Sequence, residues 1–153
     1  MVTSNDCKKK YGLPYDDVAT TVNENTAFEG KWMTSWDVPA DINSAIPCLP
    51  NKIYCNKDLV GPLEKAFRNL IDRGFAKELK TWDGCFNIRL KRGLTSLSLH
   101  SWAIAIDVNA AWNGLGKQPT MTAGFVKCFT AAGFEWGGTW TRLDGMHFQL
   151  AKI

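Results

Sequence analysis

The sequence predicts an α+β domain in which helices pack on a small antiparallel sheet. The chain has 153 residues, of which 45% are hydrophobic and 22% are charged, so it can bury one core of good size but hardly two. Two segments carry apolar residues at helical spacing, and several short apolar runs have the length of strands. Their order along the chain is helix, strands, helix, strand, which favours the α+β class.

The composition divides the chain at about residue 30. Residues 1–29 are polar and irregular, and we expect an N-terminal arm that can be part of the domain. Residues 30–153 are richer in aromatic side chains and are expected to form the main folded domain. No internal repeat and no low-complexity tract is present.

Two segments are predicted to be amphipathic helices. In residues 57–75, "KDLVGPLEKAFRNLIDRGF", the apolar positions recur every three or four residues, Pro62 suits only the first helical turn, and Gly74 is the stop signal. In residues 119–134, "PTMTAGFVKCFTAAGF", apolar side chains again share one face and Gly133 ends the pattern.

Four short segments are predicted to be strands. They are residues 85–90 ("CFNIRL"), 103–109 ("AIAIDVN") and 146–151 ("MHFQLA"), together with a short strand after the prolines of "PCLPNKIYCN".

The two histidines of the chain both lie next to an acid and a predicted strand. Strand alternation places Asp107 on the same face as the small Ala105, and a carboxylate in such an apolar run needs a partner. His100 and His147 are the available imidazoles, and two imidazoles with one carboxylate are the ligand set of a catalytic zinc site. The alternative is that both are ordinary hydrogen-bonded histidines, and the residues alone leave the two interpretations open.

Two motifs resemble those of a known family. Ser98, His100, Ala105 and Asp107 resemble the S-x-H-x-x-G-x-A-x-D signature of the zinc D-Ala-D-Ala carboxypeptidase and L-alanyl-D-glutamate endopeptidase family. "LDGMHF" resembles the second signature, in which an acid precedes the last ligand histidine by three residues. The likeness extends over about residues 30–153, through "TWDGCFNIRLKRG" and "GFEWGGTWTR". One departure is Ala103, which stands where the family has glycine, a residue used for unusual backbone conformations or close approach.

The resemblance implies a LAS/hedgehog-type peptidase fold with a zinc site at the sheet. It implies His100, Asp107 and His147 as zinc ligands and Asp144 as the general base. Zinc lowers the pKa of its water and polarises the scissile carbonyl, and a nearby carboxylate takes the proton. The alternative for Asp144 is a turn-forming aspartate before Gly145.

Further residues are expected to contact the substrate. Arg89 is the candidate for holding a substrate carboxylate or stabilising the oxyanion, with Arg92 as its competitor and an ordinary surface arginine as the alternative. Ser98 resembles a substrate-contacting serine, although it equally suits a turn cap. Trp136 and Trp140 are expected to wall a substrate groove, and core packing is the alternative for both.

The resemblance also indicates which bond is cut. Family members that act on D,D bonds tend to carry glutamate at the position of Asp144, whereas phage endolysins that cut between L-Ala and D-Glu often carry aspartate, and "GFEWGG" resembles the endolysin branch. We therefore expect an L-alanyl-D-glutamate endopeptidase from a phage or prophage, which lyses the host cell and is antimicrobial. The alternatives are a D-Ala-D-Ala carboxypeptidase and an inactive wall-binding module, the latter favoured by Ala103.

Charge and segment composition limit the partners and the location. The net charge of +3 is mild and Lys8–Lys10 form the only tight basic cluster, so we expect no nucleic-acid partner. The first residues lack the apolar segment of a secretory signal, and no run of about 18 apolar residues is present. We expect a monomer without stable membrane association, made in the host cytoplasm and released to the wall through a holin, where peptidoglycan stem peptides are its partner.

The five cysteines are odd in number and form no C-x-x-C pair, which argues against a zinc ribbon and a complete disulfide framework. Reduced thiols are expected, and a Cys48–Cys55 bridge is the alternative.

Overall fold

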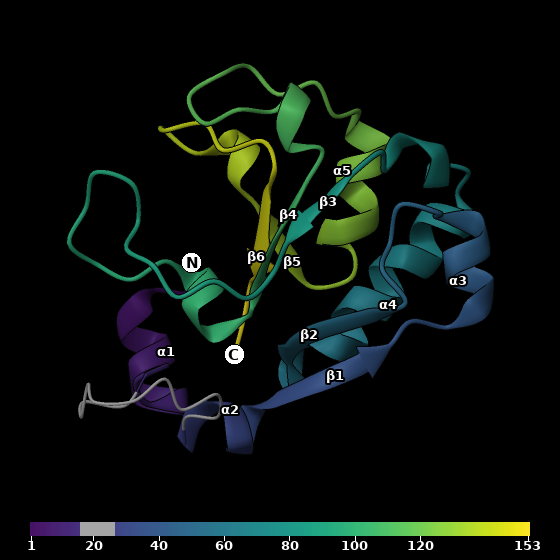
Figure 1. The fold of residues 1–153 in the computed structure, drawn as a ribbon. Coiled ribbons are helices and arrows are strands. Elements are labelled where there is room, and N and C mark those ends of the chain that lie inside the picture. Colours follow the sequence, from purple (N-terminus) through teal and green to yellow (C-terminus); the bar gives the residue numbers. More distant parts are fainter. Residues whose placement is uncertain (16–26) are drawn as a thin grey trace.

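Two antiparallel sheets and the helices that cover them make up the computed structural model, which describes residues 1–15 and 27–153 (Figure 1). Strands β1 and β2 form a small separate sheet, and the other four strands form the sheet that carries the candidate site. The predicted α+β class is confirmed.

The helices are short except for one of 16 residues. They are α1 (Ser4–Tyr11), α2 (Ala27–Trp32), α3 (Ala40–Ala45), α4 (Lys57–Asp72) and α5 (Ala123–Thr130). The strands are β1 (Met33–Asp37), β2 (Lys52–Asn56), β3 (Trp82–Gly84), β4 (Ala105–Val108), β5 (Phe134–Trp136) and β6 (His147–Leu150). Within residues 1–15 and 27–153 the 3-10 turns are η1 (Ala76–Glu78), η2 (Leu99–Trp102), η3 (Ala110–Trp112) and η4 (Gly137–Thr139). Within the two described ranges, no helix has both the length and the apolar character needed to cross a membrane.

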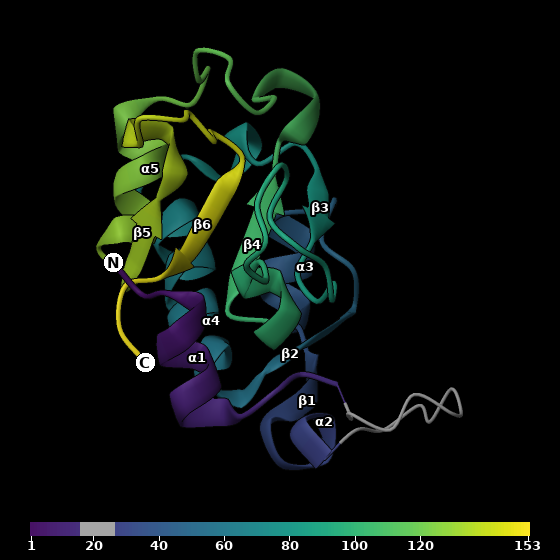
Figure 2. The ribbon, with the colours of Figure 1, turned by 90° about the vertical axis from the view of Figure 1, so that its left-hand side faces the viewer.

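The larger sheet has the strand order β3-β4-β6-β5, with helices α4 and α5 behind it in Figure 2. In the antiparallel pair β4–β6, Asp107 lies directly opposite His147 and Ile106 lies opposite Phe148. Directly opposite residues share a face, so the first pair meets on one side of the sheet and the second pair on the other. Phe148 stacks on Phe129 of α5 with ring centroids 4.4 Å apart, and this packing fixes the sheet against the helix layer.

Helix α4 confirms the first predicted helix but begins earlier than Pro62 suggested. Asn56 caps it by accepting a hydrogen bond from the Asp58 backbone N–H at 3.0 Å, so Pro62 is the sixth residue of the helix. The apolar stripe is buried as predicted, and Gly74, with φ of +80°, follows the helix end. The second predicted helix is confirmed over the shorter range of α5, which begins after the Thr122 cap.

The prediction of a strand over residues 85–90 is wrong. Strand β3 ends at Gly84, whose φ of +130° and the adjoining register shift turn the chain out of the sheet. Beyond it, the Asn87 N–H donates to the His100 carbonyl and the Arg89 N–H donates to the Ser101 hydroxyl. These bonds replace a strand ladder, and within the segment only Leu90 forms an isolated bridge, to Leu97. The other three predicted strands correspond to β2, β4 and β6.

The first part of the predicted N-terminal arm is helical and packs against the core. Thr3 and Asp6 form a capping box at the start of α1, and Cys7 and Tyr11 are buried. The Ser4 hydroxyl donates to the Leu97 carbonyl at 2.6 Å, next to turn η2. Residues 16–26 of the predicted arm lie outside the described residues, and the domain boundary at residue 30 stays a prediction.

All five cysteines are free thiols, four of them buried and Cys48 half-buried. The alternative of a Cys48–Cys55 bridge is not formed, and the Cys48 thiol instead lies 3.5 Å from the Leu79 carbonyl.

Candidate metal centre

Turn η2 delivers His100 to the face of the sheet. Ser98 caps the turn by accepting a hydrogen bond from the His100 backbone N–H at 3.4 Å. Ala103 closes it in the left-handed conformation, with φ of 52°. The His100 side chain is buried, and its Nδ1 lies 2.7 Å from the Cys85 carbonyl. Because a carbonyl oxygen only accepts, Nδ1 carries the proton and Nε2 presents its lone pair.

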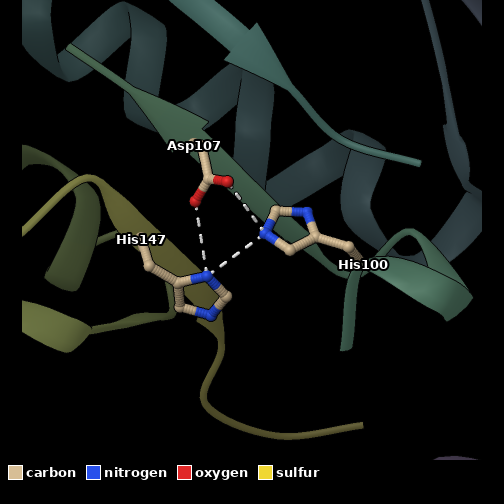
Figure 3. Close-up of side chains that lie close together, drawn as sticks. All are labelled: His100, Asp107 and His147. Atoms are coloured by element: carbon tan, nitrogen blue, oxygen red, sulfur yellow. Dashed lines mark hydrogen bonds and ion pairs between the residues drawn. The ribbon is translucent and has the colours of Figure 1, made fainter. Parts of the chain in front are cut away.

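His100, Asp107 and His147 converge on one point, as Figure 3 shows. The Nε2 of His100 lies 3.2 Å from Oδ2 of Asp107, and the Nδ1 of His147 lies 3.4 Å from Oδ1 of the same carboxylate. The two imidazole nitrogens are 3.2 Å apart. The pairing of β4 with β6 places Asp107 beside His147, and turn η2 brings His100 to both of them.

The triangle fits a tetrahedral metal ion. With bonds of about 2.0–2.1 Å, the ligand atoms of a tetrahedral zinc site lie about 3.3 Å apart, close to the 3.2 Å between the two imidazole nitrogens. Each imidazole lies nearest a different oxygen of Asp107, and one ligand atom from each of the three residues lies within 4.8 Å of the other two. Two imidazole nitrogens and one carboxylate oxygen are a donor set that zinc accepts, with a fourth position left open. The three residues can therefore hold a metal ion.

Asp107 and His147 change each other's protonation. Burial alone would raise the pKa of Asp107, but His100 and His147 hold that pKa below its ordinary value when they are protonated, because each imidazolium then donates to the carboxylate and adds a positive charge beside it. Burial alone would lower the pKa of His147, and the carboxylate of Asp107 raises it instead. The carboxylate thus stays ionised at neutral pH, as a metal ligand must.

His147 has a hydrogen-bond partner on the side away from the triangle. Its Nε2 lies 3.0 Å from Oε1 of Gln149, which is buried two residues further along β6. Each imidazole therefore uses one nitrogen for an outer partner and directs the other nitrogen to Asp107.

Asp144 lies in the loop that leads into β6. Its backbone N–H donates to the Gly137 carbonyl at 2.9 Å, and a Cβ on Gly137 would lie 2.6 Å from the Asp144 carbonyl oxygen, so this approach requires glycine. Trp136 supports the same loop by donating from its indole N–H to the Gly145 carbonyl at 2.8 Å. Burial raises the pKa of Asp144, and the nearby charge of Asp107 raises it further against the opposing charges of His147, His100 and Arg89.

A pocket of about 590 Å³ opens beside the metal centre. Asp107, Asp144 and His147 line it, so two of the three possible ligands and the candidate base face the same space. Its volume is in the range of pockets that hold peptide-sized ligands.

Most of the predicted substrate-contacting residues line this pocket. Arg89, Ser98 and Trp140 do so, and Trp140 lies beside His147 with ring centroids 5.3 Å apart. Trp136 is not among the lining residues. It stacks on Phe148 in the core, so its contribution is to support the Asp144 loop.

Cationic side chains are concentrated at the pocket. Arg89, Lys91, Arg92 and Arg142 all line it. Arg89 is half-buried and influences Asp144, whereas Arg92 is exposed and its carbonyl accepts from Arg142 at 2.7 Å. The structure thus places both arginine candidates at the pocket, with Arg89 the more enclosed.

Sequence reasoning missed the outer partners of the histidines. Gln149 carried a signal, because it lies two residues after His147 on one strand face and is polar in an apolar strand. The Cys85 carbonyl carried none, since every residue has a carbonyl group.

Comparison with known proteins agrees with the site. Residues 92–150 match a family model described as D-alanyl-D-alanine carboxypeptidase. The matched segment covers less than half of the chain, yet it contains His100, Asp107, Asp144 and His147. No curated protein and no solved structure matches the chain significantly. The match supports the zinc peptidase family of that description and, in general terms, a metallopeptidase that acts on peptidoglycan.

Proposed function

We propose that this protein is a zinc peptidase that hydrolyses the bond between L-Ala and D-Glu in peptidoglycan stem peptides. The observation that carries the proposal is the triangle of His100, Asp107 and His147, whose ligand atoms lie within 4.8 Å of one another beside an open pocket. The family match over the same segment supports the peptidoglycan substrate class.

The ligand assignment follows from the free lone pairs. His100 would bind zinc through Nε2, His147 through Nδ1 and Asp107 through its carboxylate. When bound, zinc would polarise the scissile carbonyl and lower the pKa of a water molecule in the pocket.

Asp144 would act as the general base. Its carboxylate would take a proton from the attacking water and pass it to the nitrogen of the leaving amine. The raised pKa of Asp144 supports this role, because a more basic carboxylate is a better proton acceptor. The half-buried Arg89 would bind a carboxylate of the substrate or stabilise the oxyanion.

The substrate chemistry agrees with the charge of the pocket. Stem peptides that contain D-Glu are anionic, and four cationic side chains line the pocket beside the metal centre. Trp140 would pack against the peptide next to His147.

The choice of bond rests on Asp144 and on "GFEWGG", which resemble the endolysin branch of the family. The same resemblance supports a phage or prophage lysis enzyme that is made in the host cytoplasm, acts as a monomer and reaches the wall through a holin.

A D-Ala-D-Ala carboxypeptidase is the second candidate, and the description of the matched family favours it.

The test is mass spectrometry of soluble fragments released from purified peptidoglycan, with and without a zinc chelator. We expect chelator-sensitive release of stem peptides that begin at D-Glu. Release of D-alanine alone would assign the carboxypeptidase instead. A wall-binding module without activity would release nothing even with zinc present, which would overturn the proposal.

The matched control is His147→Ala, which removes one possible ligand from the triangle. We expect this variant to lose bound zinc and hydrolysis together. A full equivalent of zinc in the variant would show that the ligand set is wrong.

A further inference from the structure

Gln149 is a buried polar residue that the proposed hydrolysis does not use. Its side chain is 3% exposed, on the same face of β6 as His147. The residue opposite it on β4 is Ala105, whose small side chain leaves room for a long amide. A buried amide must be hydrogen-bonded at both ends, and the two partners of Gln149 determine its orientation.

The first partner is the backbone carbonyl of Val2. The Nε2 of Gln149 lies 3.4 Å from this oxygen. A carbonyl oxygen only accepts, so the amide nitrogen must face Val2 and the amide oxygen must face His147. The reversed amide would place two acceptors against each other at Val2.

The second partner is the imidazole of His147. Because Oε1 of Gln149 only accepts, the proton must be on Nε2 of His147, 3.0 Å away. Nδ1 is then unprotonated and directs its lone pair to the triangle with Asp107 and His100.

The Val2 carbonyl is itself held in place. Val2 is buried, and the Ser4 hydroxyl that follows it donates to the Leu97 carbonyl at 2.6 Å. Both Met1 and Val2 line the pocket of the metal centre. The segment that leads into α1 is thus packed against the site wall.

We propose that Gln149 is a positioning residue which, oriented by the Val2 carbonyl, holds His147 as the Nε2–H tautomer and so directs Nδ1 to the metal centre. The inference rests on the proposed zinc site. Outer partners of this kind orient a ligand histidine and raise its basicity, and their loss typically costs about 10–100-fold in metal affinity.

The first experiment determines the tautomers directly. A long-range ¹H–¹⁵N NMR spectrum is recorded on metal-free protein at a pH at which both imidazoles are neutral. The chain contains two histidines, so we expect one ring of each tautomer: Nδ1–H for His100 and Nε2–H for His147. An Nδ1–H tautomer at His147 would overturn the proposal without any variant.

The second experiment measures zinc affinity by competition with a chromophoric chelator. Gln149→Met keeps the length of the side chain but removes both hydrogen bonds, and we expect about 10–100-fold weaker binding and a mixed tautomer at His147. Gln118→Met is the matched control, because Gln118 is exposed and is the other glutamine of the chain, and its zinc affinity should equal that of the wild type. Unchanged affinity in Gln149→Met would refute the role.

Gln149→Glu separates positioning from packing. A carboxylate still accepts the His147 proton, so zinc affinity should stay within about threefold of the wild type. It cannot donate to Val2, so thermal stability should fall. If Gln149→Glu lost zinc as Gln149→Met does, the role of Gln149 would be packing alone.

The outcomes also separate this inference from the proposed function. Intact peptidoglycan together with the expected tautomers and zinc affinities would reject the peptidase and keep Gln149 as a positioning residue. Chelator-sensitive hydrolysis together with unchanged zinc binding in Gln149→Met would keep the peptidase and reject Gln149 as a positioning residue.

Discussion

Single hydrogen bonds on the outer side of each imidazole determine which nitrogen faces Asp107. The Cys85 carbonyl does this for His100 and the Gln149 amide for His147. The two imidazoles therefore present opposite nitrogens, Nε2 and Nδ1, and still meet at one carboxylate. At the residue scale, two neutral carbonyl groups determine which imidazole nitrogens are free to bind a metal ion.

Asp144 is the residue whose replacement should separate metal binding from turnover. Asp144→Asn removes the base but no ligand of the triangle, so we expect full zinc content and a rate reduced by about a hundredfold or more. Zinc content and initial rates of fragment release measure the two effects. Asp72→Asn, an exposed position at the end of α4, should match the wild type in both. Near-normal turnover in Asp144→Asn would assign the base elsewhere.

The two arginine candidates can be ranked by their enclosure. Arg89 is half-buried and its charge influences Asp144, whereas Arg92 is exposed to solvent, which screens its charge. We expect Arg89→Ala to lower kcat/KM by about tenfold and Arg92→Ala to lower it less. Steady-state kinetics on soluble stem peptides would check this, and the reverse order would reassign the carboxylate site to Arg92.

Turn η2 shows at the element scale how a departure from the family pattern is accommodated. Ala103 has φ of 52°, a region that glycine enters freely and that costs an L-residue about 1–2 kcal/mol. The turn nevertheless forms, with the Ala103 N–H bonded to the His100 carbonyl and the Ala103 carbonyl accepting from the Asn56 N–H at 3.2 Å. His100 is therefore placed in the triangle despite the extra methyl group.

This conformation predicts a difference between two buried alanines. Ala66 in α4 and Ala103 are both fully buried, and glycine at either site removes a methyl group from the core. At Ala103 glycine also relieves the left-handed backbone, and at Ala66 glycine also costs about 1 kcal/mol of helix propensity, so Ala103→Gly should be less destabilising than Ala66→Gly by about 2–3 kcal/mol. Urea unfolding of the metal-free variants measures both, and a difference of about 1 kcal/mol or less, which helix propensity alone explains, would show that residue 103 is unstrained.

The elements that follow simple periodic patterns could be predicted from the sequence. The stripe of Leu59, Leu63 and Phe67 predicted α4, and alternation around Asp107 predicted its face of β4. Residues 85–90 also have an apolar pattern, but their backbone hydrogen bonds are made with turn η2, a tertiary contact that no local pattern reveals. The three-residue strand β5 was missed because it is too short to show alternation. The ligand triangle was implied by the resemblance of its two motifs to a known family, whereas the Cys85 carbonyl that orients His100 has no sequence signature.

At the scale of the whole molecule, α1 connects the site layer to the helix layer. Trp102 of η2 donates from its indole N–H to the Gly12 carbonyl at 2.8 Å. At the same end of α1, Lys10 and Tyr11 donate to the Asp58 carboxylate at 2.7 and 2.8 Å, where α4 begins. Helix α1 thus bridges the turn that holds His100 and the first turn of the longest helix.

The Asp58 contacts predict a pH-dependent stability. Burial alone would raise the pKa of Asp58, but the hydrogen bonds from Lys10 and Tyr11 hold it below its ordinary value of 3.8. Because the folded state favours the ionised form, the stabilisation is complete above pH 3.8 and is lost as the pH falls through the lower folded pKa. Asp58→Asn should cost about 1 kcal/mol at neutral pH, and the difference from wild type should shrink in acid.

Chemical unfolding across a pH series would test this expectation. Asp37→Asn is the control, because the Asp37–Lys52 ion pair is highly exposed and such pairs contribute little. A loss at Asp58 that persisted below the folded pKa would mean that the carboxylate charge is not the cause.

The direct pairing of Asp107 with His147 has a consequence for the kinetics of folding. These residues are 40 positions apart in the sequence, so the complete triangle exists only after β4 and β6 have paired. An ion that needs all three ligands binds tightly only to the native state, and contacts that form after the transition state chiefly slow unfolding. If β4 and β6 pair after the transition state, a bound metal would leave the folding rate almost unchanged and would slow unfolding. The ion proposed to activate the enzyme would then also determine the lifetime of its native state.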